Sequence, residues 1–139
     1  MKKYIALLLV VFLVLVNGCS NGEYVEVGGD RIDVEVAKTD SQISTGLMFR
    51  EELCDNCGML FVFPEEDLHG FWMKDTLIPL DIVFISSDLV VVDMFHALPC
   101  VEEVCNVYVP KEGALYVLET NMGKFNEGVV GEKVELAIQ

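Results

Sequence analysis

Residues 71–81, with the sequence FWMKDTLIPLD, place the single tryptophan of the chain, Trp72, among several groups that could bind a ligand. Lys74, Asp75 and Asp81 all lie within ten residues of it, and strand-like apolar runs follow. A buried charge must be paired, or its pKa shifts and it becomes neutral. These side chains therefore form either a structural ion-pair network or a site.

Arg50 and Glu119 extend this group of polar candidates. In a small pocket, Arg50 or Lys74 would hold an anionic group, Trp72 would supply a stacking wall, and Asp81 would act as an acceptor or base. The alternative, which we favour from sequence alone, is an internal ion-pair network that fixes the turn around residues 76–79. The candidate ligand-binding residues are Arg50, Trp72, Lys74, Asp75, Asp81 and Glu119.

No residue is assigned a catalytic role. A hydrolase that uses Asp81 and Lys74 is the least favoured function, because the sequence contains no readable nucleophile–base pair and no serine in a nucleophile-elbow sequence. The sequence therefore favours a binding or accessory module over an enzyme.

Four cysteines follow the N-terminal segment: Cys54, Cys57, Cys100 and Cys105. An even number of cysteines outside the cytosol most often forms disulfides. Three connectivities can be drawn, and the local one, Cys54–Cys57 with Cys100–Cys105, needs no long-range assumption. A four-thiolate metal site is the main alternative. A redox Cys-x-x-Cys is less favoured, because neighbouring carboxylates would raise the thiol pKa.

A second metal hypothesis uses thioether and imidazole ligands, which suit soft metals such as Cu(I). The residues available are Met48, Met59, Met73, Met94, His69 and His96. Methionine also fills irregular cores, and three of these methionines lie within apolar runs. We therefore keep a metal-handling protein as the alternative function and assign no metal ligand and no cofactor.

Residues 1–18 are predicted to be a signal peptide. Lys2 and Lys3 precede an apolar run over residues 5–16, which is shorter than the ~20 residues of an ordinary membrane span. Residues 16–19, Val-Asn-Gly-Cys, are typical of a bacterial lipobox, so we expect Cys19 to be lipidated. Residues 19–22 would then form the anchored cysteine and a short linker, and residues 23–139 one domain. An uncleaved signal anchor is the alternative.

This organisation predicts an exported protein, held by its lipid on the outer face of the cell membrane or on an outer membrane if one exists. The chain has 9 basic and 23 acidic residues, and loss of Lys2 and Lys3 changes the formal net charge from −14 to −16. Such a charge disfavours nucleic acid as a partner. The expected partners are the membrane, through the anchor, and an unidentified small molecule or envelope protein.

Short alternating or apolar runs predict a mainly β domain with one short helix. Residues 23–27 and 31–37 read as a hairpin, and the Thr39/Gln42 capping box opens a helix over about residues 40–49. Pro64 is expected to end a buried strand over residues 59–63. The other predicted strands are 69–74, 80–85, 89–95, 114–120 and 133–138. A compact antiparallel sandwich or a partly closed, jelly-roll-like barrel accommodates this order.

Residues 46–50 (GLMFR), 58–63 (GMLFVF) and 71–81 resemble motifs of the bacterial and archaeal family named "domain of unknown function 192". Residues 116–119 and 131–134 resemble its closing motifs. The resemblance implies a compact, jelly-roll-like or barrel-like β fold and a local disulfide between Cys100 and Cys105. It brings no established activity. The family usually has asparagine where this chain has Asp75.

Overall fold

The computed structural model describes residues 22–139. The predicted signal peptide and the predicted lipidation of Cys19 lie outside the described residues. Within residues 22–139, the structure contains no helix that is both long and apolar enough to cross a membrane.

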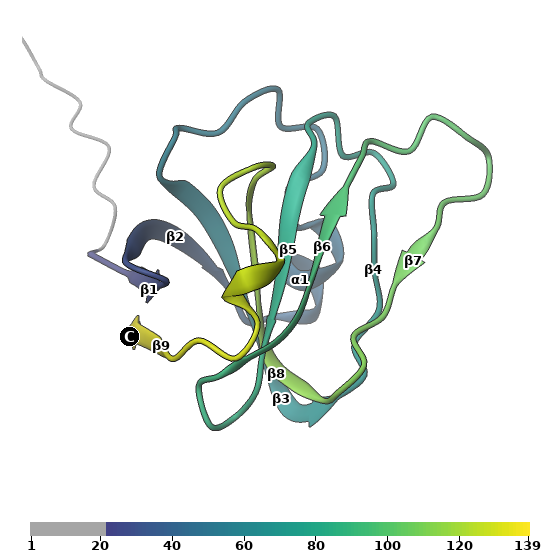
Figure 1. Ribbon diagram of the computed structural model, residues 1–139. Coiled ribbons are helices and arrows are strands. Elements are labelled where there is room, and N and C mark those ends of the chain that lie inside the picture. The colour runs from purple at the N-terminus through teal and green to yellow at the C-terminus, as the bar shows by residue number, and fades with distance from the viewer. Residues whose placement is uncertain (1–21) are drawn as a thin grey trace, which may run out of the picture.

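The alternating residues of the chain form one seven-stranded sheet, in the spatial order β6-β5-β8-β3-β2-β1-β9. Its neighbours pair antiparallel except β2 and β3, which run parallel. A two-stranded ribbon of β4 and β7 stands beside the sheet (Figure 1). The strands are β1 (Tyr24–Val27), β2 (Asp30–Ala37), β3 (Cys57–Asp67), β4 (Phe71–Trp72), β5 (Leu80–Ile85), β6 (Val91–Ala97), β7 (Val107–Tyr108), β8 (Ala114–Asn121) and β9 (Val134–Ala137). The helices are α1 (Asp40–Thr45) and the short 3₁₀ helix η1 (Glu127–Val129).

The large sheet curls into a half-barrel, because its two edges meet at one end. Val134 N donates to Leu89 O at 2.9 Å, and Val91 N donates to Glu132 O at 3.0 Å. These bonds join the segment that leads into β9 to the start of β6. The predicted mainly β fold with a partly closed barrel and one short α-helix is thereby confirmed.

Each face of the curled sheet carries its own hydrophobic cluster, because successive residues of a strand point to opposite faces. The inner cluster draws side chains from all seven strands and includes Ile32, Leu60, Val83 and Leu118. The outer cluster is covered by the segment after α1 and by β4, and includes Leu47, Phe61, Phe71, Ile82 and Phe84. Strand β5 is therefore buried on both faces over its whole length, and so are the central parts of β3 and β8.

Several predicted element boundaries were wrong, and three of them bear on the outer face of the sheet. The helix ends at Thr45 instead of residue 49, because Gly46 takes a positive φ of 47°. Strand β3 continues past Pro64, which lies in an irregular stretch between the β8 pairings of Val62 and Asp67, where its missing N–H breaks no ladder. Strand β4 is limited to two residues, because Asp75 at φ 54° belongs to the turn that follows it.

The cysteines form two local pairs at disulfide distance, as the local connectivity predicts. The Cα atoms are 5.0 Å apart in Cys54–Cys57 and 5.7 Å apart in Cys100–Cys105. The first pair precedes and opens β3, and the second closes a loop between β6 and β7. The redox state of both pairs can be tested directly.

We expect the four paired cysteines, Cys54, Cys57, Cys100 and Cys105, to resist alkylation until a reductant is added when the protein is secreted through an oxidising compartment. The physical reason is that a disulfide sulfur is no nucleophile toward the alkylating reagent. Intact-mass spectrometry before and after reduction measures this. If a chelator alone, without reductant, made these cysteines reactive toward the alkylating reagent, they would instead form a metal-thiolate site.

Candidate functional site

A cleft of about 280 Å³ lies on the outer face of the sheet, between the segment after α1 and β4. We call it the Glu119 cleft. Phe61, Phe71 and Trp72 form apolar walls, and Thr76 and Glu119 contribute polar groups. Apolar walls with a few convergent polar groups are typical of a small-molecule site.

The segment after α1 is held in place by its backbone. The capping box, in which the Thr39 side chain accepts from Gln42 N at 3.2 Å, fixes the start of the helix. At its end, a Cβ on Gly46 would lie 3.2 Å from Phe61 Cζ, and φ is positive there. Glycine therefore allows the segment to pass close over the Phe61 ring.

The opposite rim of the cleft is tied to this segment through Phe49 and Asp75. Phe49 N donates to Asp75 O at 2.8 Å, and both residues have positive φ values, of 64° and 54°. Thr76 N donates to Met73 O at 3.2 Å, and the Thr76 hydroxyl donates to Lys74 O at 3.3 Å. The two walls are thus joined by a direct backbone hydrogen bond.

Glu119 is the one carboxyl in the lining of this cleft. Its side chain comes from β8 and is 5% exposed. Burial raises its pKa to about 8, and no hydrogen bond from the described residues opposes this shift. Every fully enclosed side-chain polar atom of the described residues has a hydrogen-bond partner, so the carboxyl oxygens of Glu119 must open into the cleft. The carboxyl is therefore mostly protonated at neutral pH and free to bond to a ligand.

Trp72 forms the outer wall and is 48% exposed. Pairing with Val107 of β7 fixes its position, while its neighbour Phe71 packs edge-on against Phe61 with ring centroids 5.0 Å apart. The Lys74 ammonium lies 5.3 Å from the centroid of the Trp72 ring. Lys74 thus lies near the Trp72 ring and is not among the residues that line the cleft.

Asp81 points to the other face of the sheet. Asp81 pairs with Thr120 and Ile82 pairs with Glu119 in the register between β5 and β8, and residues opposite one another share a face. The Asp81 carboxylate is fully buried. It accepts from Phe125 N at 2.8 Å and from His96 Nδ1 at 2.6 Å. The first bond ties the segment before η1 to the sheet, and the second joins β6 to β5, so Asp81 has a structural partner for each oxygen.

Arg50 is also engaged elsewhere. Its guanidinium forms two hydrogen bonds to Glu35, at 2.8 and 2.7 Å, and this pair lowers the pKa of the Glu35 carboxyl. The predicted single cluster near Trp72 is therefore split: Trp72 and Glu119 share the cleft, Lys74 lies beside it, and Arg50, Asp75 and Asp81 do not line it. Asp75 contributes its backbone carbonyl to the rim.

Sequence reasoning did not single out Phe61, Phe71, Thr76 or Gly46 as site residues. The motifs that carry the family resemblance nevertheless contained the information that locates these residues. Residues 46–50, 58–63, 71–81 and 116–119 each contribute side chains or backbone to the lining of this one cleft. The stretches that carry the family resemblance thus converge on the Glu119 cleft.

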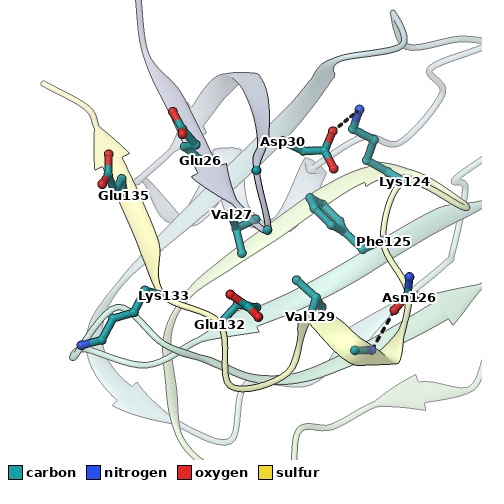
Figure 2. A pocket seen from close by; sticks show the side chains of 13 residues that line it. Glu26, Val27, Asp30, Lys124, Phe125, Asn126, Val129, Glu132, Lys133 and Glu135 are labelled. Carbon is teal, nitrogen blue, oxygen red and sulfur yellow. Dashed lines mark hydrogen bonds and ion pairs between the residues drawn. The ribbon is translucent and has the colours of Figure 1, made fainter.

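A second and larger cleft, of about 510 Å³, lies where the half-barrel is open (Figure 2). Val27, Phe125 and Val129 form its floor and belong to the inner cluster. Figure 2 shows Glu26, Glu135 and Lys133 pointing away from this floor, and Lys124 pairs with Asp30 at 3.2 Å. This cleft is the surface of a packed core edged by solvated charges.

Neither cleft presents a ready metal site. Within residues 22–139, no three His, Cys, Asp or Glu side chains come together in a way that could hold an ion. His69 stacks on Phe63 with centroids 3.6 Å apart and bonds to Glu65 O at 3.0 Å through Nε2. His96 is bonded to Asp81, so the two histidines serve different local structures.

Residues 23–136, which include every part of the Glu119 cleft, match the model of the family DUF192, described as "Uncharacterized ACR". The chain belongs to the DUF192 family. It is similar to the UPF0127 protein of Pyrococcus abyssi (33% identical, over 73% of this chain and 84% of that protein). It is also similar to the UPF0127 protein of Thermococcus sibiricus (29% identical, over 76% of this chain and 67% of that protein).

The fold is shared with a crystal structure of a protein of unknown function from Novosphingobium aromaticivorans. The TM-score is 0.73 at 36% identity, and the match covers 81% of this chain and 83% of that one. The predicted family and fold are therefore confirmed. These relatives are of unknown function, so the function of this DUF192 protein must be argued from its site.

The buried carboxyl of Glu119 should make the free energy of unfolding depend on pH. Because the pKa of Glu119 is raised from 4.5 to about 8 on folding, its protonated form is favoured in the folded state. Its contribution to stability is complete below pH 4.5 and is lost as the pH rises to about 8, at roughly 1.4 kcal/mol per pH unit. We expect Glu119→Gln to remove this slope in urea unfolding measured from pH 5 to pH 9.

Glu132→Gln, at the rim of the larger cleft, is the matched control and should retain the slope. Identical slopes in the wild type and Glu119→Gln would mean that the Glu119 carboxyl is ionised in the folded protein at neutral pH.

Proposed function

We propose that this DUF192 protein is a small-molecule-binding module of the cell envelope and that the Glu119 cleft is its binding site. The observation that carries the proposal is a carboxyl that is nearly fully buried, has no hydrogen-bond donor among residues 22–139, and opens into a cleft walled by a half-exposed tryptophan. Because the carboxyl oxygens are reached through the cleft, a ligand that fills the cleft would contact them directly.

The convergence of the motifs supports the same site. Four separated stretches of the chain supply the lining, and two of them hold residues at positive φ, Phe49 and Asp75, which cost on the order of 1–3 kcal/mol each. Backbone conformations of this kind persist where the surrounding structure imposes them and are concentrated at ligand sites. The inference here runs from the observed outliers to a site.

The envelope location rests on the chain outside the described residues. The basic start, the apolar run over residues 5–16 and the Val-Asn-Gly-Cys stretch support export and lipidation of Cys19. Two cysteine pairs at disulfide distance fit an oxidising compartment. With the domain beginning a few residues after Cys19, the cleft would operate close to a membrane surface.

The geometry favours binding over catalysis. In the described residues Asp81 is bonded to His96 and Phe125, while Lys74 is placed over Trp72, so the acid and the base of the hydrolase hypothesis are engaged in different interactions. A metal-handling function gains no support from a specific contact. The binding hypothesis alone explains why Glu119 is buried where it is.

We expect binding at the cleft to change the fluorescence of the protein, because Trp72 is its one tryptophan and forms a wall of the site. A library of small neutral and charged fragments is screened against the full chain in a non-ionic detergent, and hits are confirmed by ligand-observed NMR. Hits should weaken in Glu119→Gln and persist in Glu132→Gln. A library without a single hit that meets this pattern would leave Glu119 with a structural role alone.

Lipid anchoring makes a separate prediction. Expressed in a bacterium with its own N-terminal segment, the protein should fractionate with membranes and carry the added mass of acyl chains on Cys19. Cys19→Ser should abolish the added mass, because serine offers no thiol for the thioether bond. A wild-type protein that fractionates with membranes, retains residues 1–18 and carries no acyl mass would indicate an uncleaved signal anchor.

A further inference from the structure

The chemistry of the Glu119 cleft narrows the class of ligand, and this step rests on the proposed binding function. The lining contains one carboxyl and one imidazole, and neither lysine nor arginine contributes to it. An anionic ligand would lose its water beside apolar walls and an acidic group, with no positive side chain to compensate. Phosphates, sulfates and carboxylates are therefore poor candidates.

Aromatic rings dominate the walls. Phe61, Phe63, Phe71 and Trp72 line the same cleft that Glu119 faces. The face of an aromatic ring attracts a cation that lies within about 6 Å of its centroid, and the attraction grows when water is excluded. A neutral ligand would gain packing from these rings without this electrostatic term.

Few titratable side chains surround Glu119, so its carboxyl determines which ligand charge the cleft favours. His69 lies in the lining, with its Nε2 already bonded to Glu65 O. Lys74 lies over the Trp72 ring and outside the lining. The parts of α1, β3 and the segment after α1 that line the cleft carry no titratable side chain. The formal net charge of −14 also draws cations toward the protein.

We infer that the ligand is a small organic cation, an alkylated ammonium ion, which places its charge against Glu119 and the aromatic rings and its apolar body along Trp72. Alkylation suits the site because each N–H of a buried ammonium needs an acceptor. Beside Glu119, the buried side-chain acceptor in the lining is the Thr76 hydroxyl. An alkylated ammonium has few or no N–H groups to satisfy.

Binding of such a cation exchanges a proton for the ligand. The Glu119 carboxylic acid loses its proton to solvent, and the resulting carboxylate faces the ammonium ion. Burial raises the pKa of Glu119 to about 8. Below this pH, each increase of one pH unit raises the ionised fraction of the carboxyl about tenfold. The affinity for the cation should rise by the same factor.

The test uses choline and its uncharged isostere 3,3-dimethyl-1-butanol, which differ in one atom and in charge. Both are titrated into the full chain in non-ionic detergent, with Trp72 fluorescence and ligand-observed NMR as readouts. We expect choline to bind at least tenfold more tightly than the isostere. Its affinity should rise about tenfold from pH 6 to pH 7, and Glu119→Gln should remove both effects while Glu132→Gln retains them.

The outcomes separate this inference from the proposed function. Equal affinities for the two probes, or tighter binding of the isostere, would overturn the cation inference and leave a binding site for neutral ligands. Fragment hits at Trp72 without any binding of choline would overturn it as well. If neither probe nor any fragment binds in a Glu119-dependent manner, the binding function itself fails.

Discussion

The close pairing of β3 with β8 is the constraint on which the rest of the structure depends. A Cβ at Gly58 would lie 2.4 Å from the carbonyl oxygen of Glu119, so these two strands approach at a distance that only glycine allows. The contact sets the register in which Met59 lies opposite Glu119. A slip of one residue would turn Glu119 into the inner cluster and Thr120 toward the cleft. The Glu119 cleft exists in this register alone.

The two faces of the sheet treat their buried acids differently. Asp81, on the inner face, receives one donor on each oxygen and ties Phe125 and His96 to β5. Removal of such an acceptor would leave a buried N–H without a partner. An acid that satisfies buried donors in this way has a structural role. Glu119, on the outer face, receives no donor from the described residues and stays protonated instead. The contrast supports a structural role for Asp81 and the role in ligand binding that we propose for Glu119.

The sequence predicted those features that depend on local pattern. Alternation identified the hairpin of β1 and β2, the Thr39 and Gln42 pair identified the start of α1, and proximity along the chain favoured the two local cysteine pairs. It could not identify which residues of β5 and β8 share a face, because strand register depends on pairing partners far apart in the chain. For the same reason Arg50 was wrongly grouped with Trp72 in the sequence analysis. In the structure, the Arg50 guanidinium is bonded to Glu35 of β2. Trp72 and Glu119 were the two candidates that the fold brought into one cleft.

The rim of the cleft explains why the chain has Asp75, whose charge the sequence analysis had treated as part of a site. Asp75 is exposed and lies at φ 54°, and it contributes a backbone carbonyl to Phe49 N. Among residues other than glycine, asparagine and aspartate tolerate this conformation best. The asparagine that the family resemblance implies at this position would serve the same turn as the aspartate of this chain, whose charge stays in solvent. The motifs that carry the resemblance thus specify a shape, made of two left-handed residues, two close glycines and an aromatic wall. The one charge-bearing group in the cleft that this shape leaves without a partner is Glu119.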